Sequence, residues 1–275
     1  MDNLTQLATV ADRYGVLLCD IWGVVHNGRE AHPAACEALV RYRQGGGVVV
    51  LITNSPRPSA DVVQQLATLK VPEAAWDAVV TSGDATRFAL KTHATGPVYH
   101  LGPERDAPLH TGLGLHFTSD LVAASLISCT GLFDDEHETP DAYREMLAQA
   151  KTHNLPMVCA NPDVVVHRGD QLIYCAGALA ELYAEMGGEV ILAGKPHPPI
   201  YDLARQAAQQ HGAMESAQIL ALGDGLMTDI KGANDQGLDV VLVTGGLARD
   251  LSADELTAKM QTAGLHATYV MPALR

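Results

Sequence analysis

Four places in the sequence put a polar or charged residue directly after a short apolar run. The apolar runs are VLLC (16–19), VVVLI (48–52), VILAG (190–194) and ILALG (219–223). If these runs are parallel strands, the residues after them gather at one edge of the sheet, where α/β proteins bind their ligands. The residues concerned are Asp20, Thr53, Asn54, Lys195 and Asp224, together with Asp229 five positions after Asp224.

The stretch GDGLMTD (223–229) carries the clearest chemical signal. Its two acids, Asp224 and Asp229, have a spacing that can turn both carboxylates toward one pocket. They would repel each other there unless a hard cation lay between them, and Mg²⁺ prefers oxygen ligands and keeps waters for phosphate oxygens. The alternative is that Asp224 forms a turn and Asp229 caps a helix.

The other strand ends suit an anion. A hydroxyl at Thr53 with nearby backbone N–H groups could cradle a phosphate, and Lys195 could neutralise its charge. Asp20 could be a nucleophile or a metal ligand, although each of these residues could also be a cap, a turn former or solvated surface. A P-loop is excluded, because Glu189 stands where its first glycine should be and Pro196 replaces its Ser or Thr.

The elements that must position these residues alternate along the chain. Apolar, β-branched runs are separated by amphipathic stretches, which predicts βαβ units and a mainly parallel sheet. Strands are predicted at 16–20, 48–54, 78–82, 190–194, 219–224 and 240–246, and helices at 34–44 and 199–210. Because residues 95–188 are richer in turns and acidic loops, we expect an α/β domain at 91–189, inserted into a discontinuous core formed by 1–90 and 190–275.

The composition narrows the class of protein. With 47% hydrophobic and 18% charged residues, the 275-residue chain has the composition of a globular protein. Its formal net charge of −14 repels phosphate backbones and anionic lipids, so nucleic-acid and membrane partners are not expected. The five cysteines form no CxxC pair and predict reduced, buried thiols. No signal peptide or membrane span is recognised, so we expect a cytoplasmic protein, for which a homodimer is possible.

In their order along the chain, the motifs resemble those of the haloacid dehalogenase (HAD) superfamily, in particular its class IIA of NagD-like and nitrophenylphosphatase-like hydrolases. The matching stretches are DIWGVVHNG (20–28), LITNSPRP (51–58), GKPHP (194–198) and LGDGLMTDIKGANDQGLDVVLVTGG (222–246), and residues 159–188 resemble the class IIA cap. The resemblance covers nearly the whole chain. It implies a doubly wound, Rossmann-like parallel sheet core with an inserted α/β cap of the C2 type.

The resemblance also implies a role for each candidate residue. Asp20 would be the nucleophile that forms an aspartyl-phosphate. Thr53 and Asn54 would hold the phosphoryl group, and Lys195 would offset its charge and orient Asp20. Mg²⁺ would be bound by Asp20, the backbone carbonyl of Trp22, Asp224 and, directly or through water, Asp229.

Position 22 departs from this pattern. Phosphatases of the superfamily have a second Asp two residues after the nucleophile, which acts as general acid and base, but here the residue is Trp22. An indole N–H donates hydrogen bonds only and cannot accept a proton. Substitutes could come from His26, His167 or His197, although each of them could equally be an ordinary loop histidine.

The expected function is therefore Mg²⁺-dependent hydrolysis of a small phosphorylated metabolite, such as a sugar phosphate, a nucleotide, or an acyl or aryl phosphate. General acid–base assistance is worth roughly 10² to 10⁴ in rate, so its loss should weigh least on leaving groups that are stable anions. Two alternatives follow from Trp22: a phosphate-ligand binding or regulatory module of low turnover, or hydrolysis of a C–halogen or C–P bond. The acidic loop 133–141 and the stretch CANPD (159–163) are plausible contributors to substrate choice.

Overall fold

The chain divides into two compact units. The computed structural model describes residues 2–168 and 171–275, and it describes side chains at 2–166 and 173–275. The first unit comprises Met1–Thr53, Ala60–Val80 and Lys195–Arg275, and the second comprises Asn54–Ser59 and Thr81–Gly194. Each unit has its own sheet and its own apolar core, as the following paragraphs describe.

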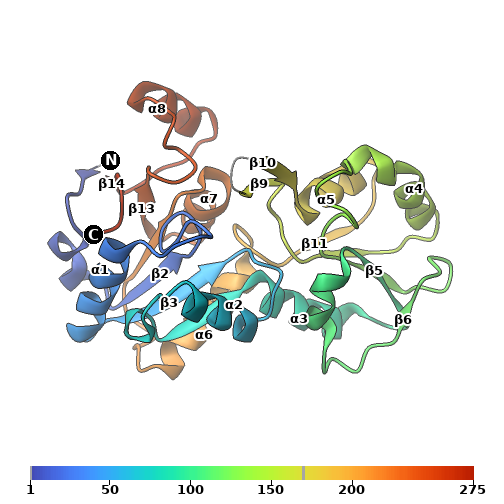
Figure 1. Ribbon diagram of the computed structural model, residues 1–275, viewed down its shortest axis with the longest axis horizontal. Coiled ribbons are helices and arrows are strands. Elements are labelled where there is room, and N and C mark those ends of the chain that lie inside the picture. The colour runs from blue at the N-terminus through green and yellow to red at the C-terminus, as the bar shows by residue number, and fades with distance from the viewer. Residues whose placement is uncertain (1, 169–170) are drawn as a thin grey trace. The chain divides into compact units, whose positions relative to one another are not determined.

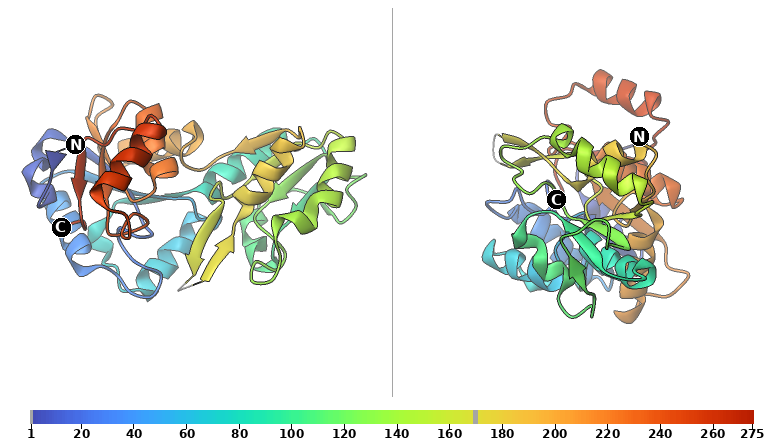
Figure 2. Two further views of the ribbon diagram at one scale, coloured as in Figure 1. Left: turned by 90° about the horizontal axis from the view of Figure 1, so that it is seen from above. Right: turned by 90° about the vertical axis from the view of Figure 1, so that its right-hand side faces the viewer.

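The first unit is built on the larger sheet. Its spatial order is β1 (Asp2–Asn3), β14 (Tyr269–Met271), β13 (Asp239–Val243), β12 (Ile219–Gly223), β2 (Val16–Asp20), β3 (Val48–Thr53) and β4 (Ala78–Thr81). The strands from β1 to β3 in this order pair in parallel. Since β1 pairs with β14, both chain ends lie at the same end of this unit (Figures 1 and 2).

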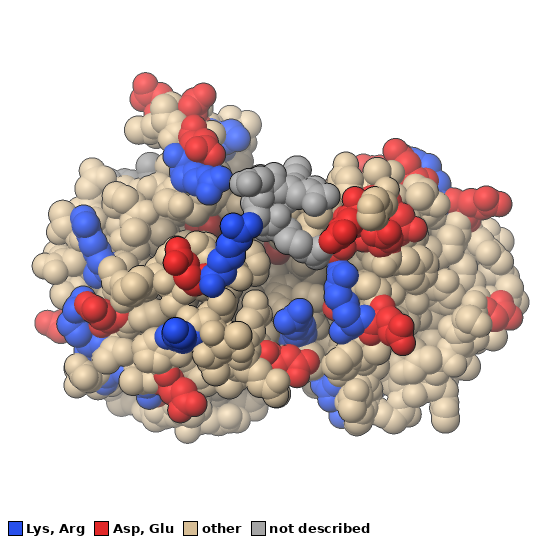
Figure 3. Space-filling view, viewed as in Figure 1, with Lys and Arg blue, Asp and Glu red and all other residues tan. Residues whose placement is uncertain are grey.

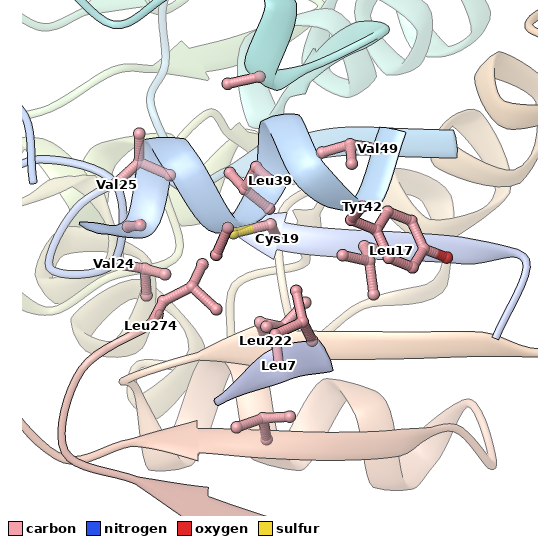
Figure 4. Close-up of a cluster of buried hydrophobic side chains, with 14 of the residues drawn as sticks. Leu7, Leu17, Cys19, Val24, Val25, Leu39, Tyr42, Val49, Leu222 and Leu274 are labelled. Carbon is pink, nitrogen blue, oxygen red and sulfur yellow. The ribbon is translucent and has the colours of Figure 1, made fainter. Parts of the chain in front are cut away.

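Helices cover both faces of the larger sheet, because its strands are apolar on both sides. In β13, Val241 and Val243 face a core that includes α1, while Val240 and Leu242 face a second core that includes α7 and α8. Figure 4 shows the first of these cores, where Leu39 of α1 packs over the central strands. Each fully buried leucine there contributes roughly 1.5–3 kcal/mol of transfer free energy.

The helices complete the element list. The α-helices are α1 (Pro33–Gln44), α2 (Ser59–Thr68), α3 (Ser82–His93), α4 (Arg144–Thr152), α5 (Ala176–Glu185), α6 (Pro198–Gln210), α7 (Lys231–Asp235) and α8 (Ala253–Thr262). Short 3₁₀ segments are η1 (Leu7–Thr9), η2 (Ala11–Arg13), η3 (Glu73–Ala75), η4 (Glu104–His110) and η5 (Pro140–Tyr143), and η6 (Leu226–Ile230) is a π-helical turn.

The second unit has a smaller, parallel sheet. Its order is β11 (Val190–Leu192), β8 (Met157–Cys159), β7 (Leu126–Cys129), β5 (Val98–Leu101) and β6 (Phe117–Thr118). Helix α3 packs on one face through Leu90, and α4 and α5 pack on the other through Leu147 and Leu179. An antiparallel hairpin is formed by β9 (Val165–Arg168) and β10 (Gln171–Tyr174).

The predicted fold class is confirmed: a doubly wound parallel α/β core is interrupted by a second α/β unit. The predicted strands are present, each within a few residues of its expected bounds. One of them lies in a different sheet from the one expected. Strand β11 was expected in the core, but it pairs with β8 of the smaller sheet. The assignment of 1–90 and 190–275 to the core and of 91–189 to the cap stays a prediction.

The surface, the helices and the cysteines show three further properties. On the face in Figure 3, acidic and basic side chains are scattered among uncharged ones. Within the described part of the chain, no helix combines the length and the apolar character that crossing a bilayer requires. All five cysteines are buried, and none of them is part of a disulfide in the described part of the chain.

Candidate active site

Three carboxylates meet at the carboxyl edge of the larger sheet. Asp20 is the last residue of β2, and Asp224 directly follows the neighbouring strand β12. Asp229 lies in the π-helical turn η6, which returns toward that strand. One oxygen from each carboxylate lies within 4.8 Å of the others, and the three residues are only 5–6% exposed. The parallel pairing of β2 with β12 is what brings these acids together.

Lys195 supplies the positive charge of this cluster. Its Nζ donates to Asp20 Oδ1 over 2.5 Å, to Asp229 Oδ1 over 2.6 Å and to the carbonyl of Ile52 over 3.3 Å. The lysine precedes α6, which packs on β3, so the helix fixes where the side chain enters the site. At 2% exposure it is not a solvated surface lysine.

Burial and charge shift the pKa values of these groups strongly. Burial, together with the charges of Asp229 and Asp224, raises the pKa of Asp20 well above its usual value, against the lowering effect of Lys195. Burial and Asp229 raise the pKa of Asp224 to about 7. Burial alone would lower the pKa of Lys195, but Asp20 and Asp229 hold it well above its usual value. The cluster therefore holds more carboxyl groups than its single lysine can neutralise, which favours binding of a proton or a cation there.

Backbone groups hold the carboxylates in place. Gly225 N–H donates to Asp229 Oδ2 over 3.0 Å, and Leu247 N–H donates to Asp224 Oδ2 over 2.9 Å. Gly23 lies so close that an added Cβ would stand 2.2 Å from Asp224 Oδ2, and its φ of +85° favours glycine as well. Larger residues at position 23 would displace Asp224 from the cluster.

The donor set fits a hard divalent cation. All three side chains offer oxygen atoms, which Mg²⁺ prefers, and a cation among them would offset the excess negative charge. Among the side chains that the structure describes, Asp20, Asp224 and Asp229 form the acidic cluster close enough to hold an ion. A metal-assisted site for a phosphate group is therefore chemically reasonable here.

The predicted phosphate-binding pair lies at the end of β3, beside β2. Thr53 and Asn54 are 8% and 5% exposed. The Asn54 amide donates to Asp163 Oδ1 over 3.0 Å, so this side chain is oriented by an acid more than 100 positions away. Sequence reasoning named Asp163 only as part of the stretch CANPD, and no spacing signal pointed to its bond with Asn54.

The loop after Asp20 presents Trp22 toward solvent. Trp22 is 45% exposed, and its backbone forms an isolated bridge with that of His26. His26 is buried, and its Nδ1 accepts a hydrogen bond from Gly28 N–H over 3.0 Å. Burial lowers the pKa of His26 to about 4, so its imidazole is neutral at pH 7. It is poorly placed to act as the missing acid or base.

Among the described residues, His197 is not part of the carboxylate cluster. Burial and the charge of Lys231 lower the pKa of His197, and the other charge acting on it is that of Asp235. Both charged residues belong to α7, and none of the three carboxylates acts on this histidine. The side chain of His167 lies outside the described residues. The structure thus brings Asp20, Lys195, Asp224 and Asp229 together and leaves the predicted histidines elsewhere or undescribed.

Comparisons with family models and with solved structures indicate the same family. A model described as haloacid dehalogenase-like hydrolase matches residues 17–116, and a HAD-hydrolase-like model matches residues 192–275. A crystal structure of a hydrolase of the haloacid dehalogenase-like family from Brucella suis 1330 is 44% identical, with a TM-score of 0.88. The alignment covers 98% of this chain and 99% of that one.

Curated relatives are more distant. The ribonucleotide monophosphatase NagD of Escherichia coli is 27% identical over 84% of this chain and 88% of its own length. The dihydroxyacetone phosphatase of Corynebacterium glutamicum is 29% identical over 85% of this chain and 82% of its own length.

Proposed function

Because the chain belongs to the haloacid dehalogenase superfamily of hydrolases, we propose that it is a Mg²⁺-dependent phosphatase of a small phosphorylated metabolite, with Asp20 as nucleophile. The observation that carries the proposal is the buried cluster of one lysine and three carboxylates at the ends of adjacent parallel strands. The names of the similar phosphatases support the substrate class.

In the proposed reaction a carboxylate oxygen of Asp20 attacks phosphorus, and the bond from phosphorus to the leaving oxygen breaks. Lys195 holds Asp20 through its 2.5 Å hydrogen bond and offsets charge on the phosphoryl group. Thr53 and Asn54, at the next strand end, would hold the phosphoryl oxygens. Water then hydrolyses the aspartyl-phosphate. Positioning and charge neutralisation are the main protein contributions to phosphoryl transfer.

Mg²⁺ would be held by Asp20, Asp224 and the backbone carbonyl of Trp22, with Asp229 as a direct or water-mediated partner. When bound, it would supply positive charge at the phosphoryl oxygens and at the nucleophile. The residues of the chain would keep it in place through Gly225 N–H and Leu247 N–H, which fix two of the carboxylates.

The test is phosphate release by the purified protein with Mg²⁺ across a panel of sugar phosphates, nucleotides, acyl phosphates and aryl phosphates. Asp20→Asn keeps the shape of the side chain and should abolish release, by 10³-fold or more on the scale of covalent catalysis. Asp235→Asn is the matched control, because Asp235 is an exposed partner of Lys231 and does not belong to the three-carboxylate cluster. Absence of any release that depends on Asp20 would refute the proposal.

The second candidate is a binding or regulatory module, which Trp22 favours because it supplies no general acid or base. Such a module would bind a phosphorylated ligand with Mg²⁺ and leave it intact. Calorimetric titration followed by recovery of the ligand separates the two functions. Intact ligand after prolonged incubation supports the module, and released phosphate supports the enzyme.

A further inference from the structure

Large apolar side chains are exposed in the loops that hold the carboxylate cluster of the first unit. Trp22 is 45% exposed, Met227 is 58% exposed and Leu247 is 65% exposed. Each belongs to a loop that also holds a carboxylate. Trp22 follows Asp20 by two positions, Met227 lies in the turn between Asp224 and Asp229, and Leu247 donates its N–H to Asp224. We call these three residues the apolar rim.

Exposed apolar residues on ordinary surfaces are scattered singly and need no explanation. The apolar rim differs, because its members come from three separate strand ends, after β2, β12 and β13, and each lies in a loop that carries or hydrogen-bonds a carboxylate of one polar cluster. Ligand sites combine such apolar walls with a few convergent polar groups. The carboxylates and Lys195 would take the phosphoryl group, which leaves the rim for the organic part of a substrate.

The indole of Trp22 is held in one orientation. Its ring lies against Gly28, where an added Cβ would stand 2.4 Å from the indole Cη2. The edge of the His26 ring meets it at a centroid distance of 5.3 Å and an interplanar angle of 75°. Gly28 has a φ of +86°, so glycine is required there by conformation and by space. A side chain braced in this way is a rigid flat surface rather than a mobile loop residue.

Neither Trp22 nor its neighbour His26 supplies a proton to the leaving group. The indole N–H does not transfer its proton, and the Nδ1 of His26 accepts from Gly28 N–H. The ammonium of Lys195 is bound between Asp20 and Asp229. A leaving oxygen that departs beside the indole therefore receives no proton from these three groups and carries away the electron pair of the broken P–O bond as an anion.

We propose that Trp22 is the specificity-determining contact of this site, a stacking surface for a planar leaving group that departs as a stable oxyanion, such as a phenolate or an aromatic carboxylate. The inference rests on the proposed phosphatase function and narrows its substrate class. Asp20 forms the new O–P bond, the old P–O bond breaks toward the leaving oxygen, and no proton moves in that step. Aromatic faces and planar groups favour offset stacking, which gives affinity without charge.

The first test is a comparison of kcat/KM for two aryl phosphates with Mg²⁺. The phenol released from phenyl phosphate has a pKa close to that of tyrosine, about 10, and 4-nitrophenol is more acidic. The wild-type protein should prefer 4-nitrophenyl phosphate by at least about 100-fold, the lower bound of what a general acid supplies. Trp22→Asp restores a carboxylic acid and should reduce this preference to about 10-fold or less.

Truncation of the ring separates stacking from proton transfer. Trp22→Ala should raise KM for 4-nitrophenyl phosphate by about tenfold while keeping the strong dependence on the leaving group. Trp22→Phe keeps a flat ring and should raise KM by less than about threefold. Met214→Ala is the control, because Met214 is 74% exposed on the loop before β12, at the opposite edge of the sheet, and its removal should change neither value.

Binding provides a readout that does not depend on turnover. Trp22 and Trp76 are the two tryptophans of the chain, so Trp76→Phe leaves a single fluorophore at position 22. Phenylphosphonate with Mg²⁺ should change the fluorescence of this variant and bind about tenfold more tightly than methylphosphonate. Gly28→Ala, which displaces the indole without removing it, should abolish that difference.

Different outcomes would refute the phosphatase function and the role of Trp22. Loss of all phosphate release that depends on Asp20 refutes the phosphatase itself. Release with equal kcat/KM for the two aryl phosphates, or equal binding of the two phosphonates, overturns the role of Trp22 and leaves the phosphatase standing. A Trp22→Ala variant that lowers unfolding stability but keeps KM would likewise overturn it, because the rim would then be only a packing surface.

Discussion

Lys195 is the residue whose removal should affect stability most clearly. Its Nζ lies 2.5 Å from Asp20 and 2.6 Å from Asp229, and the three side chains are 3%, 9% and 6% exposed. Lys195→Met keeps the length of the side chain but leaves both carboxylates buried without their shared counter-charge. Loss of one partner of a buried ion pair costs about 3–5 kcal/mol. For a domain of this size, Tm should fall by roughly 10 °C.

The assay is urea and thermal unfolding, followed by far-ultraviolet circular dichroism in EDTA. Lys231→Met is the matched control. Its ion pair with Asp235 has the same 2.6 Å length, but the side chains are 38% and 47% exposed. An exposed pair of this kind contributes no more than about 0.5 kcal/mol. The comparison therefore varies burial while the chemistry and the distance stay fixed.

The stability of Lys195→Met should depend on Mg²⁺ and on pH in ways that a simple packing defect would not produce. Mg²⁺ at 100 times its Kd stabilises a protein by about 2.7 kcal/mol, and its gain should be larger in Lys195→Met, because the ion replaces the lost charge. Lys195 lowers the pKa of Asp20, so this pKa rises further in the variant. Protonation of Asp20 then removes a buried charge, and the loss of stability should shrink as the pH falls from 8 to 5. Equal losses in Lys195→Met and Lys231→Met, or a loss below about 1 kcal/mol, would refute this account of the cluster.

Two further predictions concern stability away from the cluster. Burial lowers the pKa of His110 to about 4, so the folded protein keeps this imidazole neutral, and its Nε2 bonds to Ser128 Oγ over 2.9 Å. As the pH falls from about 6.5 toward about 4, the unfolded chain takes up a proton at this histidine that the folded chain does not, so the free energy of unfolding should decline by roughly 2 kcal/mol. In urea titrations, His110→Gln should flatten this decline. An unchanged dependence of unfolding free energy on pH would contradict the assignment. Ser252 caps α8 by accepting from Glu255 N–H over 3.3 Å, so Ser252→Ala should cost about 1 kcal/mol of unfolding free energy. In the same helix Thr257→Ala should cost nothing measurable, and equal effects of the two changes would disprove the cap.

The sequence by itself determined the elements and most of the candidate site residues. Strands such as Val16–Asp20 and Val48–Thr53 are short, apolar on both faces and bounded by turn residues, which is a local pattern. Parallel strands carry their ligand sites at the carboxyl ends, so the residue type after each strand was enough to single out Asp20 and Asp224. The sequence did not determine which strands pair. The stretch VILAG has the pattern of a core strand, but it pairs with β8 of the smaller sheet.

Only the tertiary structure decided which of these groups touch. Lys195 bonds to Asp20, 175 positions away, and to Asp229, because β12 and β2 pair in parallel and α6 packs on β3. The same holds for the bond from Asn54 to Asp163. The physical reason is that these contacts depend on strand order, register and burial, which no local period encodes. The sequence determines which residues are charged, whereas the fold buries these residues and thereby shifts their pKa values.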